Sequence, residues 1–150
     1  MKVLVLNGPN LNLLGSREPD LYGHATLADV EAALSARARL LGVGVEFRQS
    51  NSEGELVTWV QGAKDVADGI IINPGGYSHS SVAIRDALAA VGLPAVEVHL
   101  TNPAAREWFR QTDLVAGACA GVVAGFGLAG YLVALERLVV IGGGTEPGPS

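Results

Sequence analysis

The strongest constraint on the fold is a repeated alternation of short apolar runs with helix-forming segments. A solid β-branched run such as GIIIN is typical of a strand that is covered on both faces, as in a parallel sheet. The predicted strands are 3–7 (VLVLN), 43–49 (VGVEFRQ), 69–73 (GIIIN), 95–100 (AVEVHL) and 121–126 (GVVAGF). The predicted helices are 26–41, about 54–67, 80–91, 104–111 and 128–140. We therefore expect an α/β fold with a doubly wound, five-stranded parallel sheet in a single domain.

The first predicted helix carries clear signals at both ends. Thr26 is placed to cap it, and Asp29 follows three residues later, which is the spacing of a capping box. Gly42 is placed to end the helix, since glycine readily adopts the left-handed conformation of a C-cap. These signals define both ends of the helix that connects the first two predicted strands.

Composition excludes several classes of protein. Nearly half of the 150 residues are hydrophobic, which is typical of a globular domain. The net charge is −5 without a basic block, so we expect no nucleic-acid partner. Cys119 is the only cysteine, so no internal disulfide can form, and a cytoplasmic location fits. The opening MKVLVLN has too short an apolar run for a signal peptide, and we assign 1–141 to the domain and 142–150 to a flexible tail.

An uncharged stretch at 114–135 raises the alternative of a membrane span. It is long enough to cross a bilayer, and Gly117, Gly121 and Gly125 have the spacing of a transmembrane packing motif. The stretch divides better into a buried strand, a glycine turn and the start of an amphipathic helix. We therefore expect no membrane partner.

Polar residues follow the predicted strands at the points where they end. The four groups are Asn7 with the long loop to Gly23, Ser50-Asn51, the 73–76 turn (NPGG), and the 99–101 triplet (HLT). Ligands of doubly wound sheets bind outside the carboxyl ends of the strands, where the strand order reverses. The sequence therefore predicts a site at this edge, and the loop 7–23 reads as a lid over it.

Several familiar chemistries lack their residues here. The first loop is neither G-x-G-x-x-G nor a P-loop, which disfavours a dinucleotide or nucleoside triphosphate site. Lys2 and Lys64 are poorly placed for Schiff-base chemistry. His24, His79 and His99 do not have the spacing of metal ligands on one element, so we expect no metal. The chemistry that the remaining residues support is proton transfer combined with the binding of a small anion.

Glu97 and His99 are the first candidates for proton transfer. Residues two apart share one face of a strand, so the carboxylate can fix the tautomer of the imidazole and keep it protonated. The alternative is a histidine that merely satisfies its hydrogen bonds in the core. The position of His99 at a strand end favours the functional reading.

Arg17 and Tyr22 are the candidates in the lid. A tyrosine acting as a base at neutral pH needs its pKa lowered by about 3 units, roughly 4 kcal/mol. A nearby guanidinium favours the phenolate, above all where water is excluded. The alternative is that Tyr22 packs against a turn and Arg17 is a solvated charge.

Two further groups could hold an anion. Arg106 and Arg110 lie one turn apart in the predicted helix 104–111 and could bind a carboxylate, or they could pair with Glu107 at the surface. His79 could donate to a hydroxyl group or cap the following helix.

Five blocks of sequence closely resemble the type II 3-dehydroquinate dehydratase family. In order, they are N-G-P-N-L-N-L-L-G-x-R-E-P-x-x-Y-G, Q-S-N-x-E-G-E-L, I-I-N-P-G-G-Y-S-H-S-S-V-A-I-R-D-A-L, E-V-H-L-T-N with R-E-x-F-R, and G-F-G-x-x-G-Y. The resemblance covers about residues 2–138. It implies a flavodoxin-like fold and a cofactor-free dehydration of 3-dehydroquinate to 3-dehydroshikimate, by anti elimination through an enolate, in the shikimate pathway.

The resemblance also implies catalytic roles. Tyr22 would remove the proton next to the ketone, and Arg17 would lower the pKa of that tyrosine. His99 would protonate the departing hydroxyl group, oriented by Glu97, and Asn10 would hold the water that supports the enolate.

The substrate would be bound by a second set of residues. By resemblance these are Asn73, His79, Asp86, Leu100, Thr101 and Arg110, with Asp86 reaching a neighbouring subunit's pocket and Arg106 in a less defined role. The family assembles as a dodecamer, a tetramer of trimers. Residues 111–113 (QTD) depart from the family pattern by replacing a more basic stretch. The alternative function is a flavodoxin-like module that binds a small anion or a nucleotide without catalysis.

Overall fold

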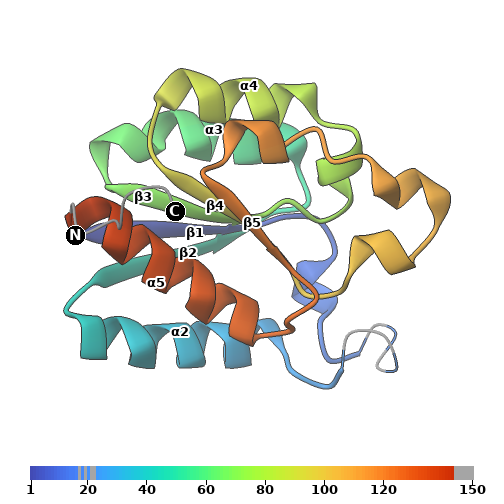
Figure 1. Ribbon diagram of the computed structural model, residues 1–150, viewed down its shortest axis with the longest axis horizontal. Helices are drawn as coiled ribbons and strands as arrows, with labels where there is room; N and C mark the ends of the chain where they lie inside the picture. Colours follow the sequence, from blue (N-terminus) through green and yellow to red (C-terminus); the bar gives the residue numbers. More distant parts are fainter. Residues whose placement is uncertain (17, 19, 21–22, 144–150) are drawn as a thin grey trace, which may run out of the picture.

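Five parallel strands form the centre of the protein, with helices on both faces (Figure 1). The computed structural model describes residues 1–16, 18, 20 and 23–143. The strands are β1 (Lys2–Asn7), β2 (Gly44–Gln49), β3 (Gly69–Asn73), β4 (Ala95–His99) and β5 (Gly121–Ala124). Their order in the sheet is β2-β1-β3-β4-β5, and every neighbouring pair is parallel. The predicted fold class is confirmed.

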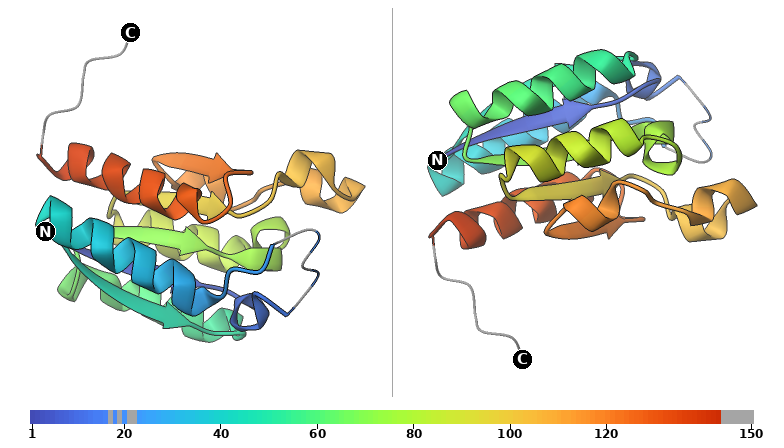
Figure 2. Two further views of the ribbon diagram at one scale, coloured as in Figure 1. Left: turned by 90° about the horizontal axis from the view of Figure 1, so that it is seen from below. Right: turned by 90° about the horizontal axis from the view of Figure 1, so that it is seen from above.

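Two pairs of helices enclose the sheet (Figure 2). Helices α2 (Leu27–Leu41) and α5 (Ala129–Gly143) cover one face, and α3 (Glu53–Gly62) and α4 (Val82–Val91) cover the other. Alternate residues of a strand serve the two layers: Val3 and Val5 pack toward α2 and α5, and Leu4 toward α3 and α4, all fully buried. Burying each such aliphatic side chain contributes about 1.5–3 kcal/mol.

The helix signals read from the sequence are borne out at α2. The Thr26 side chain accepts a hydrogen bond from the Asp29 N–H, and the Asp29 carboxylate accepts one from the Thr26 N–H, which forms the capping box. Gly42 ends the helix with φ at 71°. These caps fix where the chain enters and leaves the crossover between β1 and β2.

The prediction of a helix over 104–111 is wrong. The structure has two short 3-10 segments instead, η4 (Pro103–Ala105) and η5 (Trp108–Gln111). Between them Arg106 is extended, with φ −108° and ψ −159°. An eight-residue helix gains too few hydrogen bonds to repay its nucleation, and the Gln111 side chain donates instead to the backbone carbonyls of Pro103, Arg106 and Glu107.

Other element boundaries differ by less. The helix expected over 54–67 is α3 followed by the 3-10 segment η2 (Ala63–Asp65), and the one expected over 80–91 is preceded by η3 (Gly75–His79). Shorter 3-10 segments are η1 (Leu11–Leu13) and η6 (Ala116–Ala118). Helix α5 runs through residue 143, and residues 144–150 lie outside the described residues, so the flexible tail stays a prediction.

The uncharged stretch 114–135 is divided as expected. It comprises η6, the short strand β5 and the first part of α5. Across residues 1–16, 18, 20 and 23–143, no helix is both long and apolar enough to cross a membrane.

The sheet reverses its strand order beside β1. The chain passes from β1 to β2 on one side and then to β3 on the other, and Asn7 at the end of β1 lies in register with Asn73 at the end of β3. A crevice opens at such a point because the two crossovers leave in opposite directions. The topology thus places a site at the carboxyl ends of β1, β3 and β4.

Candidate active site

A pocket opens at this carboxyl edge, with a volume of about 140 Å³. At about 30 Å³ per molecule in the liquid, that is space for about five water molecules, which suits a small ligand. Residues that follow β1, β3 and β4, together with the segment 103–110, form its walls. The lining residues are Pro9, Asn10, Leu11, Asn73, Gly75, Gly76, His79, His99, Leu100, Thr101, Pro103, Arg106 and Arg110. Most of the predicted site residues therefore meet in one place.

His99 and Glu97 form a buried ion pair on β4. Nε2 of His99 lies 2.7 Å from Oε2 of Glu97, and their exposed fractions are 9% and 0%. Burial raises the pKa of Glu97 to about 7, against the lowering effect of His99. Burial also opposes the charged imidazole, but the carboxylates of Asp113 and Glu97 outweigh it and raise the pKa of His99 to about 9. The imidazole therefore holds its proton at neutral pH, as a general acid requires.

Asp113 is a member of this cluster that the sequence analysis did not identify. Its Oδ2 lies 3.7 Å from Nε2 of His99, and its Oδ1 accepts hydrogen bonds from the N–H groups of Val115 and Ala116, both at 3.0 Å. Burial works against its charge, but the bonds from His99, Glu97 and these two N–H groups hold the pKa of Asp113 well below its ordinary value. The departure of residues 111–113 from the family pattern was the available signal.

The three acid–base groups resemble a metal site only in composition. One ligand atom from each of Glu97, His99 and Asp113 lies within 4.8 Å of the other two. Two ligands held about 2.1 Å from one ion are about 3.0–3.4 Å apart, whereas Nε2 of His99 and Oε2 of Glu97 are 2.7 Å apart. That separation is a charge-assisted hydrogen bond, so the geometry favours shared protons over a metal.

A buried polar network supports the floor of the pocket. The Tyr131 hydroxyl donates to Oδ1 of Asn7 at 2.6 Å and accepts from Nδ2 of Asn73 at 3.0 Å. The Gly75 N–H donates to Oδ1 of Asn73 at 3.1 Å, so the amide is held at both ends. Burial raises the pKa of Tyr131, which keeps its hydroxyl protonated. Tyr131 is the last residue of the sequence block G-F-G-x-x-G-Y, but no role in the site was predicted for it.

Asn10 lines the pocket from the start of the long loop. Its backbone is left-handed, with φ at 69°, a conformation that asparagine tolerates better than most residues. Its N–H donates to Oδ1 of Asn51 at 3.0 Å, and the Gln49 side chain donates to the Gly8 carbonyl at 3.1 Å. The end of β2 thus holds the beginning of the loop in place.

His79 faces the pocket from the end of η3. Its Nδ1 lies 2.8 Å from the Thr112 carbonyl, which can only accept, so Nδ1 carries a proton. Its other ring nitrogen is then an acceptor when the ring is neutral, and a donor only when it is charged. His79 does not cap α4, because Ser81 does so by accepting from the Ile84 N–H.

Four of the lining residues, Thr101, Pro103, Arg106 and Arg110, follow β4 in the chain, and we call them the arginine wall. A guanidinium N–H of Arg106 donates to the Thr101 hydroxyl at 3.3 Å. Nε of Arg110 donates to the Glu107 carboxylate at 2.6 Å, which leaves its terminal nitrogens for a ligand. Arg110 therefore both pairs with Glu107 and lines the pocket, although the sequence had offered these as alternatives.

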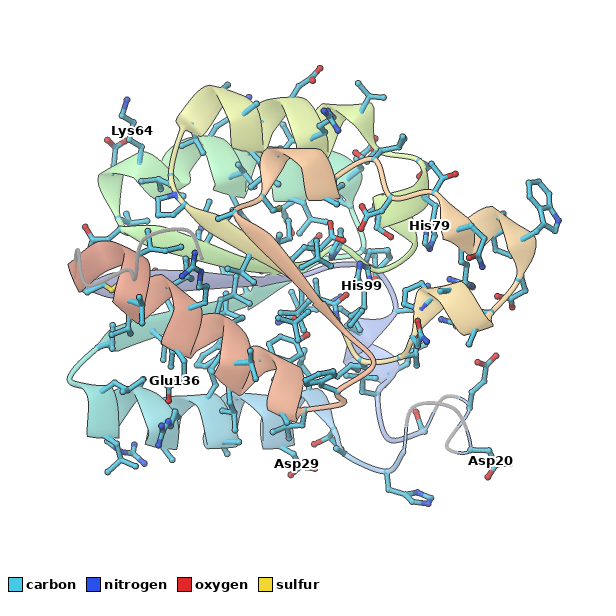
Figure 3. All side chains as sticks on the ribbon, in the orientation of Figure 1. Asp20, Asp29, Lys64, His79, His99 and Glu136 are labelled. Carbon is cyan, nitrogen blue, oxygen red and sulfur yellow. The ribbon has the colours of Figure 1, made fainter. Side chains whose placement is uncertain are left out.

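Two of the predicted residues that the structure describes, Asp86 and Glu97, do not line this pocket. Glu97 is fully buried and contacts His99, which does line it. Asp86 is exposed on α4. Arg17 and Tyr22 lie outside the described residues. Figure 3 shows His79 and Asp20 of the long loop on one side of the molecule, His99 nearer its middle, and Lys64 on the other side. Both labelled histidines, His79 and His99, line the pocket.

A protonated histidine and two arginines at the switch point of a doubly wound sheet define an α/β protein suited to acid–base chemistry on a small anion. Residues 1–139 match the family described as dehydroquinase class II. The chain therefore belongs to the class II dehydroquinase family, which confirms the resemblance found in its sequence. This assignment does not favour the alternative of a binding module without catalysis.

Individual relatives support the same family. A protein named 3-dehydroquinate dehydratase from Phenylobacterium zucineum is 60% identical over 134 residues, covering 89% of this chain and 92% of its own. A protein named catabolic 3-dehydroquinase 1 from Aspergillus terreus is 53% identical over 138 residues, covering 92% and 91%. The crystal structure of type II dehydroquinase from Propionibacterium acnes has a TM-score of 0.89 at 45% identity, covering 93% of this chain and 96% of that one.

Proposed function

We propose that this protein dehydrates 3-dehydroquinate to 3-dehydroshikimate, in the shikimate pathway, without a metal or an organic cofactor. The observation that carries the proposal is the contact between His99 and the buried Glu97 at the wall of a pocket that is also lined by two arginines. Eliminating water across a carbon–carbon bond needs an acid for the hydroxyl and a base for the neighbouring carbon. The family assignment supplies the substrate.

The acid step falls to His99. Because Nε2 is engaged by Glu97, the proton on Nδ1 is the one available to the departing hydroxyl group, which leaves as water. The electron pair of the broken carbon–oxygen bond leaves with that oxygen, and the enolate electrons form the new carbon–carbon double bond. Glu97 then stabilises the orientation of the neutral imidazole until solvent returns the proton.

The base step falls to the loop. By resemblance, Tyr22 as phenolate takes the proton next to the ketone, and Arg17 stabilises that phenolate. A water held by Asn10 would donate a hydrogen bond to the enolate oxygen as charge develops there. Placing the loop over the pocket would exclude bulk water and strengthen each of these interactions.

Substrate binding uses the remaining residues of the pocket. Asn73 and His79 offer groups for ring hydroxyls, and the backbone of Leu100 and Thr101 with the side chain of Arg110 forms the carboxylate end. Paired donors from a guanidinium match the geometry of a carboxylate, so the arginine wall orients the ring toward His99.

Absorbance of the conjugated enone product tests the reaction directly. We expect purified protein to convert 3-dehydroquinate at the same rate with and without a chelator, and borohydride to trap no intermediate. Tyr22→Phe and Arg17→Ala should each lose turnover while keeping the circular-dichroism spectrum of the wild type. Activity near that of the wild type in either variant would refute the roles assigned to the loop.

We also propose a cytoplasmic homododecamer, a tetramer of trimers. Exposure of Asp86 outside its own pocket supports a role in a neighbouring subunit's pocket. Sedimentation measures the assembly. If Asp86 acts across subunits, mixing Asp86→Ala with His99→Gln subunits should restore some sites, and no recovery would contradict the shared pocket.

A further inference from the structure

Asp113 faces the general acid from a different part of the chain than Glu97 does. Glu97 is two residues from His99 on β4, whereas Asp113 lies between η5 and η6, beyond the arginine wall. Its Oδ2 is 3.7 Å from Nε2 of His99, and 27% of its side chain is exposed. We propose that Asp113 is a positioning residue whose fixed carboxylate holds His99 in its imidazolium form, an inference that rests on the proposed role of His99 as the acid.

The two carboxylates differ in what stabilises their charge. Oδ1 of Asp113 accepts from two backbone N–H groups, so the carboxylate is a stable anion. Oε1 of Glu97 is buried and has no hydrogen-bond partner among the described residues, so little besides His99 favours its ionised form. Asp113 therefore supplies a lasting negative charge, including at a pH where Glu97 has taken up a proton.

The backbone around Asp113 is held on both sides. The Thr112 carbonyl accepts from Nδ1 of His79 at 2.8 Å. The Leu114 N–H donates to the Ser78 carbonyl at 2.8 Å, and the Arg85 guanidinium donates to the Leu114 carbonyl at 2.9 Å. The segment 112–114 thus touches both histidines of the pocket, which fits a positioning role better than an incidental surface charge.

Several other titratable or charged groups lie near His99 and could influence its charge. Glu97 acts from the same strand, and Arg106, Arg110 and His79 line the same pocket. Cys119 is close enough for Glu97 and Asp113 to help burial raise the pKa of its thiol to about 12, so it stays neutral. Among the described residues, the anions paired with His99 are thus Glu97 and Asp113.

Nuclear magnetic resonance titration of the His99 imidazole tests the proposal without relying on activity. The His99 signal is assigned by its loss in His99→Gln. Asp113→Asn keeps an oxygen to accept the two backbone hydrogen bonds and removes the charge. We expect it to lower the pKa of His99 by about one unit or more. The control Asp65→Asn removes an equal charge from an exposed position on η2 and should leave that pKa unchanged.

Kinetics provide the second readout. If the pKa of His99 falls by about one unit, kcat/KM of Asp113→Asn should be about fivefold lower than wild type at pH 9 and within twofold at pH 6.5. Asp113→Glu should restore part of the rate at pH 9. A merely structural role would instead reduce the rate equally at every pH.

The possible failures are distinguishable. A titration of His99 in Asp113→Asn that matches wild type would overturn the inference, as would a pKa at or below the ordinary 6.5 in the wild-type protein. Should Asp113→Asn not fold, Asp113→Ser removes the same charge. If wild-type protein did not dehydrate 3-dehydroquinate, the proposed function would fail, while the titration would still decide whether Asp113 holds the imidazolium.

Discussion

The strand-end side of the pocket is held by the core of the protein, whereas the arginine wall is held by its own polar contacts. Asn73 and His99 end strands of the central sheet and are 3% and 9% exposed. Arg106 lies between two short 3-10 segments and Arg110 lies on the second of them, and the neighbouring Trp108 is 84% exposed. The difference indicates a division of labour: rigid strand ends place the reacting groups, and a lightly packed segment supplies charge for binding.

Replacing the general acid on the strand-end side should have the largest effect on the rate. We expect His99→Gln to lower kcat by about 10²–10⁴-fold, the usual contribution of a general acid, with a smaller effect on KM. Stopped-flow absorbance of the enone measures the rate. Circular dichroism and product binding serve as controls for an intact pocket. A kcat within tenfold of wild type would mean that another group protonates the hydroxyl.

Removing a guanidinium from the arginine wall should act mainly on binding. Arg110→Ala should raise KM about 10–100-fold, because a hydrogen bond to a charged group is worth about 1.5–3 kcal/mol, while kcat changes less. Arg39→Ala, an exposed arginine on α2, is the matched control for net charge. If kcat fell as far as it does in His99→Gln, the division of labour between the two sides would be refuted.

Substitutions at the strand ends should lower the free energy of unfolding more than substitutions in the arginine wall. Tyr131→Phe deprives Asn7 and Asn73 of the hydroxyl that both contact, so it should lower the free energy of unfolding by about 1–3 kcal/mol. Trp108→Ala should change it by less than about 0.5 kcal/mol, since that side chain is largely in solvent. Urea unfolding measures both. Equal losses would show that the arginine wall is packed as firmly as the strand ends.

The sequence predicted best those features that depend on neighbouring residues. The buried run of β3, the capping box at Thr26 and the pairing of Glu97 with His99 all follow from local periodicity or spacing, and all are confirmed. The predicted helix over 104–111 was wrong because the helical spacing of its side chains was the only signal, and that spacing does not determine the backbone conformation. There, the hydrogen bonds of Gln111 and the extended backbone at Arg106 separate the segment into two short 3-10 turns.

Contacts between distant parts of the chain were beyond local reasoning. Tyr131 reaches Asn7 across 124 positions, and its place in an apolar helical stripe conceals the hydroxyl's role. Asp113 reaches His99 only because the chain returns to β5 past the end of β4. Such contacts follow from topology, which strand order determines and local sequence does not.

The pH dependence of kcat/KM for wild-type protein tests most directly the claim that a protonated His99 serves as the acid. Because the carboxylates around it raise the pKa of His99 to about 9, the acidic form should persist through neutral pH and be lost above that value. With folding verified at each pH by circular dichroism, we predict a falling limb with a midpoint near pH 9. Activity that continued to rise through pH 10 would contradict the account.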